Sequence, residues 1–374
     1  MKTPNLFKYA TSELSQDAVL AYILSWAKPE YSQDYPKLNQ LGERLLRALV
    51  AAAADGKGAP NPLNDSSITE LDIQTQYKHI DICLRINGDI FLIIEDKTNT
   101  CEAPGQIDRY EKAAEERQAR RGETWQILPV YVKTGNECQP SVPPKYVRFM
   151  REDLLKVLDD TPCTENTIID DFRGYISDWQ NQTDSYTTTQ WRKWCWCAHE
   201  GYYMNLEQWM RKELKPQDFP SWRYVSNPAG GFLGFWWYWR PFKPHNCQLY
   251  LQIEPDMKGD PQHKRTRLHI RAGSAKADDN TDIKTHKNLL YAVLKAIEDA
   301  ASQERFASLR IEKAGRYGGG WSANVADLFF DDQTDSYLAV SEDGILDWPA
   351  TQNRLLLAME LLDAVSSLSP KGSK

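Results

Sequence analysis

One stretch, residues 79 to 97, constrains the fold of this chain more than any other. Its sequence, HIDICLRINGDIFLIIEDK, contains two apolar runs rich in β-branched residues, separated by Asn87-Gly88-Asp89. Asn-Gly between hydrophobic residues is the strongest short-range signal for a β-hairpin. The stretch is therefore predicted to form two antiparallel strands joined by a tight loop.

Acidic residues lie on both strands of this hairpin. Asp81 belongs to the first strand, and Glu95, Asp96 and Lys97 close the second. A carboxylate at the end of so apolar a strand is costly to bury unless its charge is compensated. Mg²⁺ can do this, because it takes one or two protein carboxylates and leaves its other positions to water and phosphate. We therefore expect Asp81 and Glu95 to bind Mg²⁺, for which Mn²⁺ could substitute.

Strand geometry gives Lys97 a separate role. Residues two apart on a strand point to the same face, so Lys97 lies beside Glu95 while Asp96 points away. The Lys97 ammonium would contact the attacking water and the scissile phosphate. Carboxylates, a divalent cation and a lysine together meet the usual requirements for metal-assisted phosphodiester hydrolysis.

The register of the hairpin tests this interpretation. A two-residue turn would pair Asp81 with Ile94 and leave Glu95 on the opposite face of the sheet. A three-residue loop with Gly88 in the left-handed conformation would instead place Asp81 opposite Glu95. We predict the three-residue loop, or a bulge with the same effect. The alternative is an ordinary amphipathic hairpin whose terminal charges are solvated.

The pattern of Asp81, thirteen intervening residues, Glu95-x-Lys97 resembles that of the PD-(D/E)XK nuclease superfamily. The resemblance extends to the pair Gln106-x(3)-Tyr110 and to the upstream helical stretch SELSQDAVLAYILSWA, and it covers roughly the first 150 residues. It is greatest to stand-alone bacterial nuclease-like proteins of phage defence or restriction. One departure is that Ile80, where this superfamily often has proline, precedes Asp81.

The resemblance implies an α/β fold with a restriction-endonuclease-like core, a mixed central sheet flanked by helices in the order αβββαβ. It implies a metal-dependent nuclease, with DNA as the expected substrate and defence as the expected role. Glu13, at the head of the first helix, matches a position that reaches the metal, whereas Asp17 is expected only to favour the helix N-terminus. Gln106 would orient the site, and Tyr110, four residues on, would face nucleic acid.

The pattern along the chain predicts the core elements in that order. Helices are expected over residues 11–28, 36–54 and 105–120, and strands over 68–76, 126–132 and 146–149. Strand 126–132 should run parallel to the central strand, because a helical crossover precedes it. We place the nuclease core in residues 1–160 and a second, α+β region in 161–374, which would supply substrate, partner or oligomer contacts.

The second region is predicted to contain its own set of helices and strands. Helices are expected over 151–180, 187–214, 284–304 and 350–366, and strands over 232–239, 247–254 and 266–272. The run Trp236 to Trp239 could stack bases, although alternation along a strand lets only half of these rings face a ligand. Arg265, Arg267 and Arg271 could contact phosphate, or this surface could bind a partner protein.

Composition limits what the chain could bind. The net charge of −7 gives no global attraction to nucleic acid, so a local basic patch, a metal or a partner must deliver the substrate. Two alternatives therefore stay open: an effector nuclease that is silent until a partner from the same operon or oligomerisation activates it, and a non-catalytic module that binds nucleic acid or protein. The sequence shows no membrane-length apolar run and no signal peptide, so we expect a cytoplasmic protein.

Overall fold

The computed structural model describes residues 4–100, 103–138, 146–227, 230–242, 247–257, 264–274, 283–315, 317, 322–330 and 336–367. The chain divides into two compact units, Met1–Asn181 and Gln182–Lys374. This boundary lies beyond the expected one at residue 160. The difference arises because α5 (Thr167–Asp184) contributes Phe172 and Ile176 to the hydrophobic core of the first unit.

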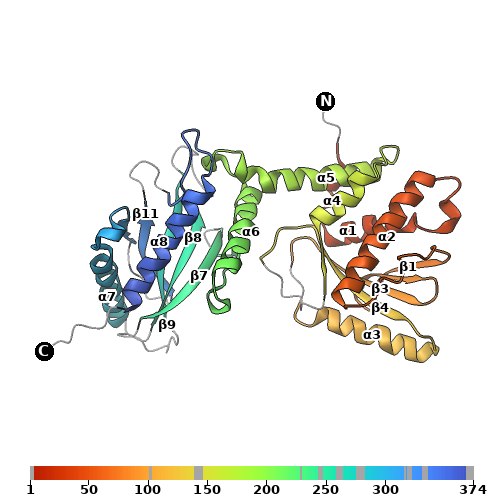
Figure 1. Ribbon diagram of the computed structural model, residues 1–374, viewed down its shortest axis with the longest axis horizontal. Helices are drawn as coiled ribbons and strands as arrows, with labels where there is room; N and C mark the ends of the chain where they lie inside the picture. The colour runs from red at the N-terminus through yellow and green to blue at the C-terminus, as the bar shows by residue number, and fades with distance from the viewer. Residues whose placement is uncertain are drawn as a thin grey trace. The chain divides into compact units, whose positions relative to one another are not determined.

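The first unit is built on a five-stranded mixed sheet (Figure 1). Its strands are β1 (Leu71–Tyr77), β2 (Ile80–Ile86), β3 (Ile90–Lys97), β4 (Gln126–Lys133) and β5 (Arg148–Met150). The strands β1, β2 and β3 pair antiparallel, whereas β4 pairs parallel with both β3 and β5. The predicted parallel pairing across the helical crossover is confirmed.

Helices cover both faces of this sheet. They are α1 (Glu13–Ser25), α2 (Pro36–Gly56), α3 (Gln106–Arg121), α4 (Arg151–Asp160) and α5. Residues such as Leu92 and Ile94 of β3 join the core formed with α1 and α2, while Phe91 and Ile93 pack with α3 on the other face. β3 is therefore buried along its whole length. The α/β, restriction-endonuclease-like fold is confirmed.

One helical stretch of the first unit is interrupted. The sequence predicted helix over 151–180, but the structure has two helices, α4 and α5, with an irregular segment between them. Pro162 lies in that segment and lacks the amide hydrogen that a continuous helix needs.

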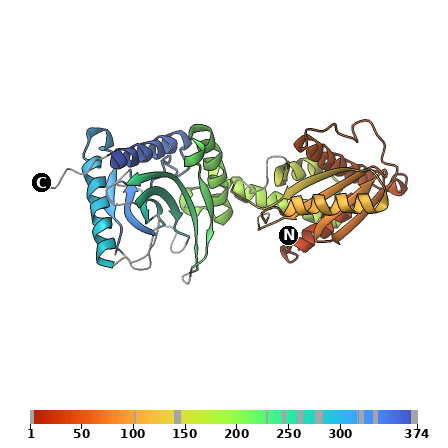
Figure 2. The ribbon, with the colours of Figure 1, turned by 90° about the horizontal axis from the view of Figure 1, so that it is seen from below.

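The second unit contains a six-stranded antiparallel sheet in the order β10-β11-β9-β8-β7-β6. The strands are β6 (Ser221–Val225), β7 (Phe232–Phe242), β8 (Cys247–Pro255), β9 (Thr266–Ser274), β10 (Arg310–Lys313) and β11 (Ser322–Phe329). The helices are α6 (Trp196–Glu213), α7 (Ile283–Ala301) and α8 (Trp348–Ser367). This sheet is strongly curved, and the three helices lie on three sides of it in the view of Figure 2.

The long helix predicted over 187–214 is wrong in its first part. Short 3-10 turns occupy Ser185–Thr187 and Trp191–Lys193, and the helix α6 begins at Trp196. Gln190 and Trp194, which flank the second turn, are extended, so the chain bends before α6.

Further 3-10 turns lie at Leu6–Lys8, Pro29–Tyr31, Pro216–Asp218 and Glu304–Phe306. Among the helices that the structure describes, none is both long and apolar enough to cross a membrane.

Candidate active site

The register of the central hairpin brings two carboxylates together. Ile86 pairs with Ile90 and Ile82 with Ile94, so the next position places Asp81 opposite Glu95. This register requires the three-residue loop, in which Gly88 has a φ of +83°. The predicted register is confirmed. Asn87 also adopts a positive φ, and its side chain accepts a hydrogen bond from the amide of Thr69, which ties the loop to the start of β1.

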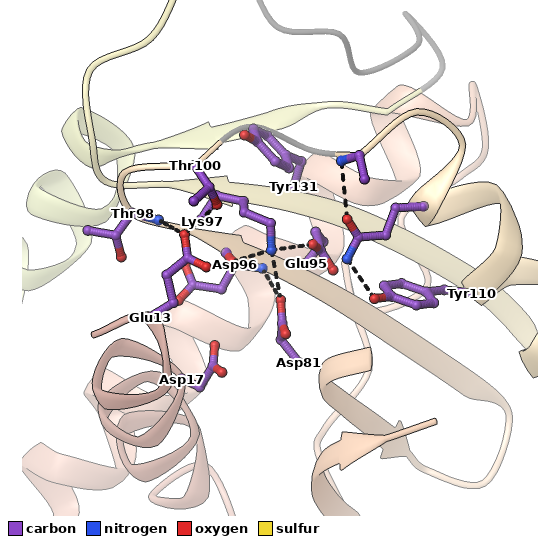
Figure 3. Close-up of polar contacts among 12 residues, drawn as sticks. Glu13, Asp17, Asp81, Glu95, Asp96, Lys97, Thr98, Thr100, Tyr110 and Tyr131 are labelled. Carbon is purple, nitrogen blue, oxygen red and sulfur yellow. Dashed lines mark hydrogen bonds and ion pairs between the residues drawn. The ribbon is translucent and has the colours of Figure 1, made fainter. Parts of the chain in front are cut away.

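Three oxygens surround the Lys97 ammonium (Figure 3). Lys97 Nζ contacts Glu95 Oε1, lies 3.6 Å from Asp81 Oδ2, and donates a hydrogen bond to the main-chain oxygen of Asp96 at 3.1 Å. The amide of Asp96 in turn donates to Asp81 Oδ2 at 3.0 Å. The side chains that the sequence assigned to catalysis at positions 81, 95 and 97 therefore converge on one point.

Burial sets the charge of this group. Glu95 is completely buried, and burial, helped by the neighbouring charge of Asp81, raises the pKa of Glu95 to about 8. Burial alone would lower the pKa of Lys97, but the pairing with Glu95 and Asp81 outweighs this effect and raises it. Lys97 therefore stays a cation beside the acidic side chains of Glu95 and Asp81.

The donor set fits a hard divalent cation. Glu95 Oε2 is buried and has no hydrogen-bond partner among the residues that the structure describes. Within that part of the chain, no three His, Cys, Asp or Glu side chains form a metal cluster. Asp81, Glu95 and the main-chain oxygen of Asp96 nevertheless offer an all-oxygen set, and Mg²⁺ commonly binds through one or two carboxylates and completes its octahedron with water. The residues fit such an ion.

Glu13 lies at the edge of the site, at the start of α1. Ser12 caps this helix through its side chain, so that Glu13 occupies the first turn. Glu13 Oε1 accepts hydrogen bonds from the amide of Thr98 at 3.2 Å and from Thr100 Oγ1 at 2.6 Å. Although burial opposes it, these bonds and the charge of Lys97 lower the pKa of Glu13, so it stays ionised.

A second acidic pair, which the sequence did not assign to the site, lies behind the first. Asp17 is buried rather than exposed at the helix terminus, so the expectation of a simple dipole contact is wrong. Burial and the charge of Asp81 raise the pKa of Asp17 to about 6, and burial together with Asp17 raises that of Asp96. Gln76 donates to Asp17 at 3.1 Å, and Gln16 donates to Asp96. Hydrophobic periodicity places Asp17 on α1 but gives no signal for this contact.

Gln106 and Tyr110 lie one turn apart on α3, as expected. Gln106 Nε2 donates to Tyr110 Oη at 2.7 Å, and its Oε1 accepts from the amide of Ala103 at 3.2 Å. Tyr110 lies on the side of Glu95 away from Glu13 (Figure 3). Burial and the nearby charge of Glu95 raise the pKa of Tyr110. These contacts place the pair beside the site, with Tyr110 largely buried.

Two further side chains were missed in the sequence because they depend on strand pairing. Tyr131 and Lys133 of β4 are the register partners of Glu95 and Lys97. Tyr131 Oη donates to Glu137 at 3.0 Å, and the fully buried Lys133 donates to the main-chain oxygen of Thr100 at 2.6 Å. The second lysine therefore anchors the segment that holds Glu13.

The three arginines predicted to bind nucleic acid lie in the second unit. Arg267 and Arg271 share one face of β9, and Arg265 immediately precedes that strand. Arg271 Nη1 lies 3.3 Å from Glu254, and Arg267 Nη1 lies 4.0 Å from Asp327. The positive charges of Arg271 and Arg267 are therefore partly balanced by Glu254 and Asp327, which lie on neighbouring strands.

A mixed sheet flanked by helices, with an acid opposite a Glu-x-Lys pair at the end of its central hairpin, defines a nuclease-type core. Comparison with protein-family models matches residues 4–209 to the PD-(D/E)XK nuclease superfamily, which is more than half of the chain. The chain belongs to the PD-(D/E)XK nuclease superfamily. No curated protein and no solved structure matches it. Members of this superfamily generally use divalent metal ions, and their substrates are nucleic acids.

Proposed function

We propose that the first unit is a Mg²⁺-dependent phosphodiesterase that cleaves DNA internally. The observation that carries this proposal is the convergence of Asp81, Glu95 and the main-chain oxygen of Asp96 on the Lys97 ammonium. Two carboxylates and one lysine at the end of a central strand provide both a cation site and a fixed positive charge. Metal-assisted hydrolysis of a phosphodiester can use both.

Each residue has a defined part in this proposal. Asp81 and Glu95 hold the cation, which when bound supplies charge neutralisation at the phosphate and a more acidic water. Lys97 positions the attacking water and stabilises the negative charge that develops on the phosphoryl oxygens. Glu13, kept ionised by Thr98 and Thr100, contributes an outer contact to the cation. Gln106 orients the site through Tyr110.

The biological role is proposed from the resemblance to bacterial nucleases of restriction and phage defence. That resemblance favours DNA as the substrate, a defence or restriction role and the cytoplasm as the place of action. Contacts to DNA are proposed for Arg265, Arg267 and Arg271 in the second unit, whereas the largely buried Tyr110 would act by holding Gln106. Mn²⁺ would substitute for Mg²⁺ because it accepts the same oxygen donors.

A second candidate is an effector nuclease that is silent until a partner or oligomerisation activates it. One observation favours it: the Lys97 ammonium itself contacts Glu95, and the Glu95 carboxylate is completely buried. A divalent ion must compete with that ammonium. A partner or a second copy of the chain that shifts β3 or α1 would shift this competition.

Cleavage of supercoiled plasmid tests the proposal. Purified protein is incubated with Mg²⁺, with Mn²⁺ or with EDTA, beside Asp81→Ala and Lys97→Ala variants. Lys112→Ala, which alters an exposed lysine of α3, is the matched control. We expect metal-dependent nicking that both site variants lose and the control keeps. Cleavage that persists in Lys97→Ala or in EDTA would refute the assigned roles, and cleavage only after addition of a partner protein would favour the second candidate.

A further inference from the structure

One face of the second sheet carries a row of partly exposed aromatic rings. Cross-strand partners share a face, so Trp236 lies on the same side as its partner Gln252 of β8, and Tyr250 lies two residues before Gln252. The neighbouring position Trp237 pairs with Leu251 and is completely buried on the opposite side. The rings facing away from that core are Phe232, Trp236, Trp239 and Tyr250, which we call the aromatic face.

Gly234 lets two of these rings approach the strand between them. A Cβ atom at position 234 would lie 2.8 Å from the Trp236 ring and 3.0 Å from the Phe232 ring. Any other residue there would therefore displace the rings from the strand. The absence of a side chain at Gly234 therefore leaves the space over the middle of β7 to the rings of Phe232 and Trp236.

A bulge in β7 adds Trp239 to the same face. Trp237 pairs with Leu251 and Arg240 with Leu249, so Tyr238 and Trp239 together oppose the single residue Tyr250. Tyr238 accommodates the extra residue with a φ of +64°, a conformation that costs free energy for a tyrosine. As a result Trp239 stacks on Tyr250, with ring centroids 6.0 Å apart and planes inclined by 24°. Bulges commonly redirect side chains at functional surfaces.

Basic side chains accompany the aromatic face. Arg223 of β6 pairs with Gly234, is exposed, and places its guanidinium 5.8 Å from the centre of the Trp236 ring. Arg267, whose side chain is 43% exposed, and Arg271 lie on the same face of β9. Two acidic side chains lie on the same face, Glu254 of β8 beside Arg271 and Asp327 of β11 beside Arg267, so across β6 to β9 and β11 the three arginines exceed the acids by one positive charge.

We propose that the aromatic face binds single-stranded nucleic acid, with bases stacked on Trp236 and Trp239 and phosphates contacted by Arg223 and Arg267. Flat rings interleaved with arginines are the arrangement that binds unpaired bases without sequence preference. The bases of a duplex are stacked on one another and cannot lie on such a platform. This inference rests on the proposed function for the class of ligand and adds that the recognised strand is unpaired.

Fluorescence anisotropy of labelled oligonucleotides tests this binding separately from cleavage. The full-length protein is titrated in EDTA against an oligothymidine, an oligouridine and a duplex of the same length, over a range of salt concentrations. We expect preference for single strands and affinity that falls with salt. Comparing the two single strands separates DNA from RNA. Equal or tighter binding of the duplex, or no binding of either single strand at low salt, would overturn the proposal.

Variants locate the binding on the aromatic face. Trp236→Leu and Trp239→Leu should each weaken single-strand binding about tenfold or more, because one stacked base contributes about 1–3 kcal/mol. Trp236→Phe keeps a smaller ring and should give an intermediate affinity. Arg223→Gln should weaken binding and reduce its dependence on salt. Tyr291→Leu, which removes an exposed ring on α7, should bind as the wild type does.

Further outcomes distinguish single-strand binding at the aromatic face from the proposed nuclease activity of the first unit. Lys112→Ala, which alters an exposed lysine of the first unit, should bind single strands as the wild type does. If the single strand binds but plasmid is never cut, the nuclease proposal fails and the aromatic face stands. If plasmid is cut but both tryptophan variants bind single strands as tightly as wild type, the aromatic face is not the binding surface. Urea unfolding of each variant establishes that it is folded.

Discussion

Glu95 and Lys97 lie two residues apart on β3 and form an ion pair in which the glutamate side chain is completely buried. Replacing a buried ion pair by apolar residues is often neutral or stabilising, so stability alone gives little reason to keep one here. Asp81 approaches the same ammonium from β2 at 3.6 Å. Because burial raises the pKa of Glu95 to about 8, a divalent cation that binds here near neutral pH would release a proton from Glu95.

Removing the ammonium should destabilise the metal-free protein. Lys97→Met leaves the buried Glu95 and the partly buried Asp81 without their cation, and we expect the free energy of unfolding to fall by about 3–5 kcal/mol. Added Mn²⁺ should restore more stability to this variant than to the wild type, because the ion takes over the same oxygens. Urea unfolding in EDTA and in Mn²⁺ measures both effects. An unchanged midpoint in EDTA would contradict the argument, and Lys112→Met is the control.

A small residue after β4 should prove essential to the site. A Cβ atom at Gly135 would lie 1.8 Å from the main-chain oxygen of Thr98, whose amide binds Glu13. Gly135→Ala must therefore shift the Thr98 segment, and we expect at least a tenfold loss of nuclease activity per folded molecule, with destabilisation of about 1–3 kcal/mol.

Gly122→Ala is the matched control for that experiment. Gly122 ends α3 with a φ of +64°, and a Cβ atom there meets nothing within 4 Å. The substitution should cost about 1–2 kcal/mol through its left-handed backbone conformation. Activity per folded molecule should be unchanged. Equal losses of activity in the two variants would show that stability, and not the position of Thr98, limits the reaction.

The hydroxyl of Thr100 should set the position of Glu13. Thr100→Val removes the 2.6 Å hydrogen bond to Glu13 Oε1 while keeping the side-chain volume. Hydrogen bonds to charged groups contribute about 1.5–3 kcal/mol, so the Mg²⁺ concentration for half-maximal cleavage should rise about tenfold. Thr100→Ser retains the hydroxyl and should behave as the wild type. A valine variant with unchanged Mg²⁺ dependence would remove Glu13 from the proposed cation contacts.

The sequence carried the information for the hairpin because local turn chemistry determines it. Asn87 and Gly88 favour positive φ, which predicts the hairpin, and among its two possible registers only the three-residue loop pairs Asp81 with Glu95. The position of Asp81 opposite Glu95 follows from that register alone. Thus the candidate catalytic group could be predicted from a single local element together with a family resemblance.

The remainder of the site depends on contacts between distant segments. Asp17 meets Asp96 only when α1 packs on β3, and Lys133 comes beside Lys97 only through the parallel pairing of β3 with β4. No local pattern encodes these contacts. The same limit explains the long helix predicted over 187–214: aromatic residues there suit a helix, but tertiary packing of Trp191 and Trp194 in the core starts α6 only at Trp196.

A buried histidine should make the second unit sensitive to acid. His199 of α6 is 3% exposed, and burial, with a smaller effect of Lys264, lowers the pKa of His199 from 6.5 to about 3. The folded state therefore favours neutral His199, whereas the unfolded state takes up a proton below about pH 6.5. Stability from this group is complete above that pH and is lost as the pH falls towards 3.

Urea unfolding at about pH 7 and pH 5 measures this loss. Between these values the His199 contribution should reduce the free energy of unfolding by about 2 kcal/mol, since each unit of pKa difference corresponds to about 1.4 kcal/mol. His199→Phe fills a similar space beside Trp194, does not titrate, and should lose less stability over the same interval. If wild type and variant lose the same stability between the two pH values, His199 is protonated in the folded protein and its environment is not the apolar one described.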